Sequence, residues 1–167
     1  MKAAIKMAGE TVRNLGFNMR ELMSGEHEFE QGFGPEGTFQ MQFDVRWGPG
    51  SMVEFLDPRG SGFMVNDLEG TVTIGGLCYE APCRGSLKLD YLGEHRITYD
   101  FDFLVGDQPY NFVGQKVNIK PWNLPVSHTT CFGVLKERGS GRLVSRSVTF
   151  FKMGTLPRFL TSFRLSR

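Results

Sequence analysis

The sequence lacks an excess of charge of either sign. Its 167 residues include 19 Lys and Arg and 18 Asp and Glu, which gives a net charge of +1. Proteins that bind nucleic acid mainly through phosphate contacts carry a clear basic excess or a basic stripe. The balanced charge argues against that class, so we expect no nucleic-acid partner.

Long apolar runs are also missing. No segment approaches the roughly 20 apolar residues of a transmembrane helix, and residues 1–17 hold no apolar run of signal-peptide length. Cysteine is scarce, because Cys78, Cys83 and Cys131 are the only three and form an odd count. These features predict a cytoplasmic protein with reduced thiols and no membrane span.

Phenylalanine and glycine, in contrast, are abundant, with 15 and 21 residues, and 40% of the chain is hydrophobic. Aromatic side chains favour strands around a wide interior, and glycine favours turns. A chain of this length buries roughly 70% of its unfolded surface. We therefore expect one antiparallel β domain over residues 1–167.

Period-two alternation marks the strands. In TFQMQFDVRW, residues 38–47, apolar residues occupy every second position and polar residues the others. This pattern predicts a strand with one buried and one hydrated face. Similar segments at 17–24, 68–74, 87–91, 97–105, 109–119, 129–135 and 143–152 bring the expected total to about eight strands.

Helices are expected near both ends and after the first long strand. Helical spacing predicts a segment over residues 1–16, and Ser51 and Glu54 form a capping box before a short helix over Met52–Leu56. A closing helix over 155–167 has the apolar stripe Leu156, Phe159, Leu160 and Phe163. The predicted fold is all-β: an antiparallel up-and-down barrel of about eight strands, whose closure leaves no free edges.

The alternation on neighbouring strands also predicts one continuous core. Its expected members are Phe39, Phe43, Trp47, Val72, Leu89, Tyr99 and Phe101. The interior of a barrel of this size is either filled by side chains or holds one small ligand.

Lys116 is the residue that most suggests chemistry. It shares a strand face with Tyr110, Phe112 and Gly114. If that face is the interior, Lys116 can bind a carboxylate or carbonyl, or act as a base or nucleophile. Two alternatives stay open. The opposite face is also mostly apolar, which would leave Lys116 at the surface, and a lysine at a barrel end can pair with an acid for structural reasons.

The segment NIKPWNLPVSH, residues 118–128, is predicted to form a loop that can lie at the mouth of a cavity. Trp122, His128 and the following Thr130 are therefore ligand-binding candidates, although Trp122 can equally plug the barrel end. The predicted ligand-binding set is Lys116, Tyr110, Phe112, Trp122, His128 and Thr130.

Other polar residues favour structural roles. His27 lies between Glu26 and Glu28 and is expected on a strand surface, and Cys131 is expected to be packed rather than nucleophilic. Cys78 and Cys83 lack a second pair of ligands, so we expect no metal site. The carboxylates are scattered along polar faces, and the sequence assigns no catalytic residue.

Five motifs follow one another along the chain: ELMSGEHEF (21–29), FLDPRGSGFMVNDLEGTV (55–72), DQPYNFVGQKVNI (107–119), HTTCFGVL (128–135) and LPRFLTSFRL (156–165). Their order resembles the lipocalin-like domain attached to cholesterol-oxidase-like flavin enzymes of the glucose–methanol–choline oxidoreductase group. The resemblance covers about residues 17–167 and implies a lipocalin-like barrel, with a flavin oxidoreductase as a possible partner.

The chain departs from that domain in two respects. It carries residues 118–128 where the attached domains usually have an acidic Asp-Asp-Pro-Gly loop, and it contains no Gly-x-Gly-x-x-Gly nucleotide fingerprint. Oxidase activity belongs to the neighbouring enzyme in such fusions. We therefore expect no cofactor in this chain.

The leading functional prediction is non-catalytic binding of a hydrophobic small molecule in a barrel cavity, based on the aromatic interior. The resemblance implies a fatty acid, sterol or isoprenoid. One alternative is a small barrel isomerase or hydratase that uses Lys116 with His128 or Tyr110 as acid and base. The other is an accessory subunit of a flavin oxidoreductase, which a filled barrel with an exposed apolar patch would favour.

Overall fold

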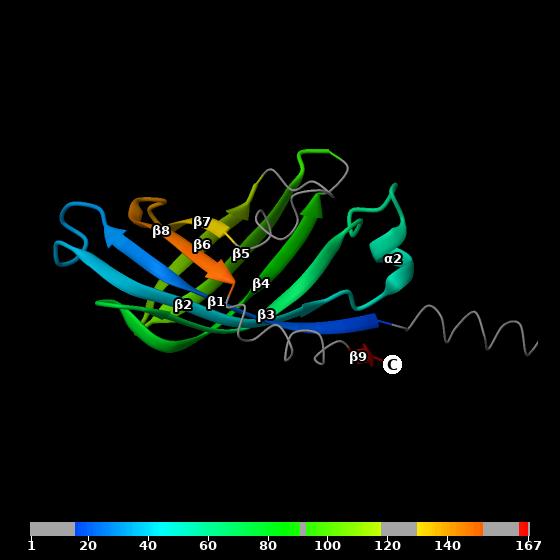
Figure 1. Cartoon of the computed structure of the whole chain (residues 1–167), viewed down its shortest axis with the longest axis horizontal. Helices are drawn as coiled ribbons and strands as arrows, with labels where there is room; N and C mark the ends of the chain where they lie inside the picture. Colours follow the sequence, from blue (N-terminus) through cyan, green and yellow to red (C-terminus); the bar gives the residue numbers. More distant parts are fainter. Residues whose placement is uncertain (1–15, 91–92, 118–129, 152–163, 167) are drawn as a thin grey trace, which may run out of the picture.

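The computed structural model of the protein describes residues 16–90, 93–117, 130–151 and 164–166. These residues form a closed antiparallel barrel of eight strands (Figure 1). The strands are β1 (Gly16–Phe29), β2 (Thr38–Gly48), β3 (Val65–Ile74), β4 (Cys78–Asp90), β5 (Arg96–Val105), β6 (Gln108–Lys116), β7 (Thr130–Glu137) and β8 (Leu143–Phe151). The predicted all-β barrel is confirmed.

Neighbouring strands follow the chain order from β2 to β8. β1 pairs with β8 on one side and with β2 on the other, and this closes the barrel. Each of the eight strands therefore has a paired neighbour on both sides, so the barrel has no edge strand.

The short helix α2 (Met52–Leu56) follows β2, as the capping box predicts. The Ser51 hydroxyl accepts a hydrogen bond from the Glu54 N–H at 3.5 Å, and Phe55 packs into the core. β2, β4 and β6 all run towards this end of the barrel, because successive strands alternate in direction. We call it the α2 end.

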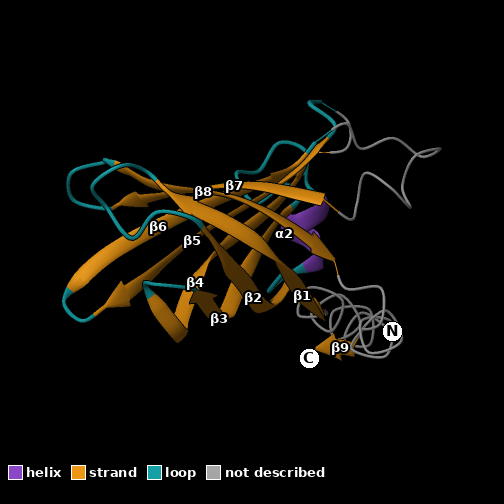
Figure 2. Ribbon diagram, turned by 60° about the vertical axis from the view of Figure 1, so that its left-hand side comes forward, coloured by secondary structure: helices purple, strands orange, loops and turns teal. Residues whose placement is uncertain are grey.

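The C-terminus differs from the prediction. Arg164–Ser166 form a short strand, β9, which pairs with residues 16–18 at the start of β1 (Figure 2). The predicted closing helix therefore does not reach the end of the chain. Its apolar stripe ends at Phe163, and beyond that point backbone pairing with β1 decides the conformation. The rest of that helix, and the predicted helical segment before residue 16, fall outside the described residues.

An aromatic layer fills the middle of the barrel. The ring centroid of Phe43 lies 5.7 Å from that of Phe101 and 5.6 Å from that of Phe112, and the last two rings are 4.8 Å apart. β2 lies across the barrel from β5 and β6 in the strand order, so these contacts span the interior. The layer separates the α2 end from the opposite end.

The core prediction is confirmed for six of its seven residues. Phe43, Trp47, Val72, Leu89, Tyr99 and Phe101 are buried in one cluster. Phe39 is only half-buried, near the start of β2 at the opposite end, where it packs against the rings of Phe29 and His27.

Candidate functional site

Lys116 lies on the inner wall of the barrel. Burial alternates along β6, and Phe112, Gly114 and Lys116 all face inward. The pairing with β5 and β7 is continuous through Gly114, so no bulge resets the alternation. Only 3% of Lys116 is exposed. Of the positions that the sequence left open for this residue, the structure selects the interior.

Glu21 is the partner of Lys116. It comes from the inner face of β1, is 5% exposed, and its Oε1 accepts a hydrogen bond from Lys116 Nζ. β7 and β8 separate β1 from β6 around the barrel, so the two side chains meet across the interior. The ion pair is thus buried at both partners, where charges are costly unless paired and hydrogen-bonded.

Two aromatic side chains complete the arrangement around Glu21. Tyr99 donates its hydroxyl hydrogen to Glu21 Oε2 at 2.8 Å, and Trp47 Nε1 donates to the same oxygen at 3.3 Å. The Tyr99 ring also faces the ammonium group, with Lys116 Nζ 5.2 Å from its centroid. We call Glu21, Lys116, Tyr99 and Trp47 the polar cluster.

The hydrogen-bonding capacity of the polar cluster is used fully at Glu21 but only in part at Lys116. Both oxygens of the Glu21 carboxylate accept hydrogen bonds from neighbouring side chains. An ammonium group has three N–H donors, but within the described part of the chain Lys116 Nζ donates a hydrogen bond to Glu21 alone. Lys116 can therefore donate to a further oxygen.

The polar cluster lies on the α2 side of the aromatic layer. Lys116 comes four residues after Phe112 on β6, and Trp47 comes four residues after Phe43 on β2. Four residues of strand span about 13 Å. The cluster therefore stands at the α2 end, and Lys116 directly precedes the last described residue before the loop that the sequence singled out.

Among the described residues, the structure does not bring the predicted site residues together. Phe112 belongs to the aromatic layer, and Tyr110 stacks on Phe103 near the opposite end, with ring centroids 5.7 Å apart. Thr130 faces away from the interior, because it lies on the same face of β7 as the exposed Phe132. Trp122 and His128 lie outside the described residues. A ligand-binding role for this set remains a prediction.

Sequence reasoning missed Glu21 as a site residue. The signal was present, because Glu21 shares its strand face with Met19 and Met23, and an acid on an apolar face needs a partner. Tyr99 and Trp47 were expected in the core, but only as packing residues. Their polar atoms are what fix the orientation of the carboxylate.

His27 is buried, contrary to the expectation of a surface residue. It lies on the inner face of β1 and is 1% exposed, because strand alternation turns its neighbours Glu26 and Glu28 outward. His27 Nε2 donates to the Gly75 carbonyl at 2.9 Å, while Nδ1 has no hydrogen-bond partner among the described residues. Burial lowers the pKa of His27. Six residues, or about 20 Å of strand, separate it from Glu21, so it is not part of the polar cluster.

The cysteines are free and poorly suited to nucleophilic chemistry. Cys131 is buried, as expected, and burial raises the pKa of its thiol to about 12. Burial also raises the pKa of Cys83 to about 12. At neutral pH both remain thiols rather than reactive thiolates. In the described part of the chain, no group of three or more His, Cys, Asp or Glu residues is placed to hold a metal ion.

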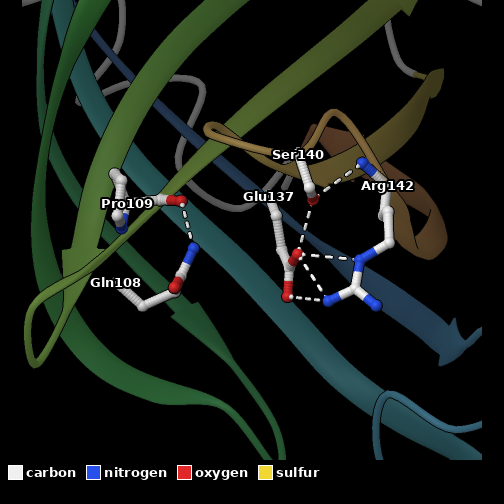
Figure 3. A network of polar contacts seen from close by, with 5 residues as sticks. All are labelled: Gln108, Pro109, Glu137, Ser140 and Arg142. Carbon is white, nitrogen blue, oxygen red and sulfur yellow. Dashed lines mark hydrogen bonds and ion pairs between the residues drawn. The ribbon is translucent and has the colours of Figure 1, made fainter.

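A second polar network lies at the hairpin between β7 and β8 (Figure 3). Glu137 accepts hydrogen bonds from the Ser140 hydroxyl at 2.6 Å and from Arg142 Nη2 at 2.9 Å. These bonds lower the pKa of the Glu137 carboxyl, the Ser140 bond most strongly. Arg142 is largely exposed. The network fixes a surface turn and does not form an enclosed site.

No protein-family model, curated protein or solved structure matches the chain significantly. None of the helices in the described residues has the length and apolar character needed to cross a membrane. The closed eight-strand barrel is consistent with a lipocalin-like architecture and compatible with binding of a small molecule.

Proposed function

We propose that the barrel binds a hydrophobic small molecule at its α2 end, and that Lys116 contacts the polar oxygen of the ligand. The observation that supports this proposal is that Lys116 has N–H donors left over after its hydrogen bond to Glu21. A buried ammonium group with unused N–H donors favours an additional acceptor. The surrounding interior is aromatic and apolar, which is typical of small-molecule sites with a few convergent polar groups.

The charge of the cluster favours a neutral head group. Glu21 already balances Lys116, so a ligand carboxylate would leave one net negative charge inside the barrel. Burying an unbalanced charge is costly. A hydroxyl or ketone oxygen accepts from Lys116 without that cost. Among the three expected ligand types, a sterol or an isoprenoid alcohol is therefore preferred over a fatty acid.

The aromatic layer limits how deeply such a ligand inserts. Phe43, Phe101 and Phe112 already occupy the middle of the barrel. We therefore place the ligand between this layer and the α2 end, with its oxygen at Lys116. The role is binding rather than catalysis, because the one carboxylate of the polar cluster already accepts three hydrogen bonds and is held by them as the counterion of Lys116.

Fluorescence titration tests the proposal with three probes: dehydroergosterol, farnesol as its competitor, and cis-parinaric acid. We expect saturable binding of the two alcohols at one site, and binding of the acid at least about tenfold weaker. Lys116→Met removes a charge-assisted hydrogen bond worth about 1.5–3 kcal/mol, which lowers affinity for the alcohols by at least about tenfold.

Arg20→Met is the matched control, because Arg20 is the neighbour of Glu21 on β1 but faces outward and pairs with Asp44. It should leave affinity unchanged. The proposal fails if no probe binds saturably, or if folded Lys116→Met binds the alcohols as tightly as the parent protein.

A further inference from the structure

The outside of the barrel has two different characters. The outward positions of β2 to β5 are mainly polar, with residues such as Asp44, Arg46, Glu69, Thr71, Lys88 and Asp100. Tyr79 and Leu104 are isolated exceptions close to hairpins. On β6 to β8 and at Val117, just after β6, apolar residues instead occupy six outward positions near the α2 end, with Gln115 and Thr130 as the polar residues among them.

These apolar side chains form one continuous surface, which we call the apolar face: Val113, Val117, Phe132, Val134, Val148 and Phe150. Val113 lies opposite Val134 across β6 and β7, and Phe132 lies opposite Val148 across β7 and β8. Directly opposed residues on one sheet face are in side-chain contact range. The apolar face therefore spans three adjacent strands.

Two phenylalanines dominate this surface. Phe132 is 53% exposed and Phe150 is 49% exposed. Single exposed hydrophobic residues are normal on proteins, but a contiguous patch with aromatic residues is typical of an interaction surface. The outer face of β2 to β5 carries polar residues on the same barrel. The apolar residues on β6 to β8 are therefore not a general consequence of the barrel geometry.

An acidic row borders the apolar face. Glu26 on β1 lies opposite Val148, and Glu28 lies opposite Arg146. Glu30, just after β1, pairs with Arg146. The three glutamates and the apolar face line one shared hollow over β8, where β1, β8 and β7 lie side by side (Figure 2). The surface is thus apolar on one side and acidic on the other.

We propose that this surface binds a protein partner through a cationic amphipathic helix. The apolar stripe of such a helix would pack on Phe132 and Phe150, and its basic residues would face Glu26 and Glu28. A helix fits better than an added strand, because β6, β7 and β8 are paired on both edges and offer no open edge. An anionic membrane fits poorly, because the glutamate row repels it.

The test uses a synthetic peptide of about 18 residues, or five helical turns, with leucines on one face and lysines on both flanks. A control peptide carries glutamate in place of each lysine. Binding to the full chain is measured by fluorescence anisotropy. We expect the cationic peptide to bind at least about tenfold more tightly than the acidic one. Phe132→Ser should weaken its binding at least about tenfold, as should the double change Glu26→Gln and Glu28→Gln.

Leu104→Ser is the matched control, because Leu104 is also exposed and apolar but lies on β5, outside the apolar face. It should leave binding of the cationic peptide unchanged. Equal binding of the two peptides, no binding of either, or equal losses in Phe132→Ser and Leu104→Ser would overturn the proposal. So would sedimentation analysis that showed a dimer which Phe132→Ser converts to monomers, because a second copy would then be the occupant.

Discussion

The buried ion pair of the polar cluster predicts a distinct pattern of stability in three variants. Lys116→Met leaves the Glu21 carboxylate buried with only the Tyr99 and Trp47 donors, and Glu21→Gln leaves the ammonium group without its counterion. Removing one member of a buried pair costs about 3–5 kcal/mol. We expect each single variant to lose about that much free energy of unfolding.

The double variant Glu21→Gln/Lys116→Met should lose less than either single variant. It buries no charge at the site, and the amide oxygen of the introduced glutamine can still accept from Tyr99. Replacing a buried ion pair with uncharged residues of similar volume is often nearly neutral. If the double variant loses less than about 3 kcal/mol, the coupling energy between the two positions is about 3 kcal/mol or more.

Urea unfolding followed by far-ultraviolet circular dichroism measures these losses. Arg20→Met is again the control, because the Arg20 side chain is 52% exposed in its ion pair with Asp44. Exposed pairs contribute at most about 1 kcal/mol. If Lys116→Met costs less than about 0.5 kcal/mol, or if the losses of the two single variants simply add in the double variant, the ion pair does not have the role described here.

Three further predictions follow from the interior. Phe43→Ala removes the ring that contacts both Phe101 and Phe112, so we expect a loss of about 3–5 kcal/mol in urea unfolding; a loss under about 1 kcal/mol would mean that the layer is not packed as described. Burial lowers the pKa of His27 from 6.5. The unfolded chain therefore takes up a proton at this residue before the folded chain does. The stability that the neutral His27 contributes is complete above pH 6.5 and declines as pH falls from 6.5 towards the folded-state pKa. His27→Gln should reduce the pH dependence of the urea midpoint in this range, and an unchanged slope would contradict the assignment. Cys131, with its thiol pKa raised to about 12, should react with a thiol reagent at pH 8 only after the protein is unfolded; fast reaction of the native protein would refute its burial.

Strong local signals predicted the regular parts of the fold. The alternation over residues 38–47 and the capping box at Ser51 and Glu54 both depend on neighbouring residues, and the structure has β2 and α2 at those positions. The first half of β4 was missed. Its pairing with β3 shifts between Val72 and Ile74, Glu80 has a positive φ of 47°, and Pro82 is exposed within the strand. These irregularities disrupt the alternation that would reveal a strand.

For the polar cluster, the sequence pointed to Lys116 but not to its partner Glu21. Alternation on β6 left two possible orientations for Lys116, because both faces of that strand are largely apolar. Its partner Glu21 lies 95 residues away, and only closure of the barrel brings the two together. Contacts across a barrel depend on the relative register of several strands, and a single sequence does not specify that register.

Native mass spectrometry identifies directly which molecule the barrel binds. The purified protein is incubated with a lipid mixture that contains free fatty acids, sterols and isoprenoid alcohols, and the mass of any bound molecule is read from the intact complex. We expect a complex with one neutral alcohol in the parent protein and in Arg20→Met, and a complex at least about tenfold weaker in folded Lys116→Met. No complex, a complex mainly with a fatty acid, or an alcohol complex that Lys116→Met leaves undiminished would contradict the proposed site.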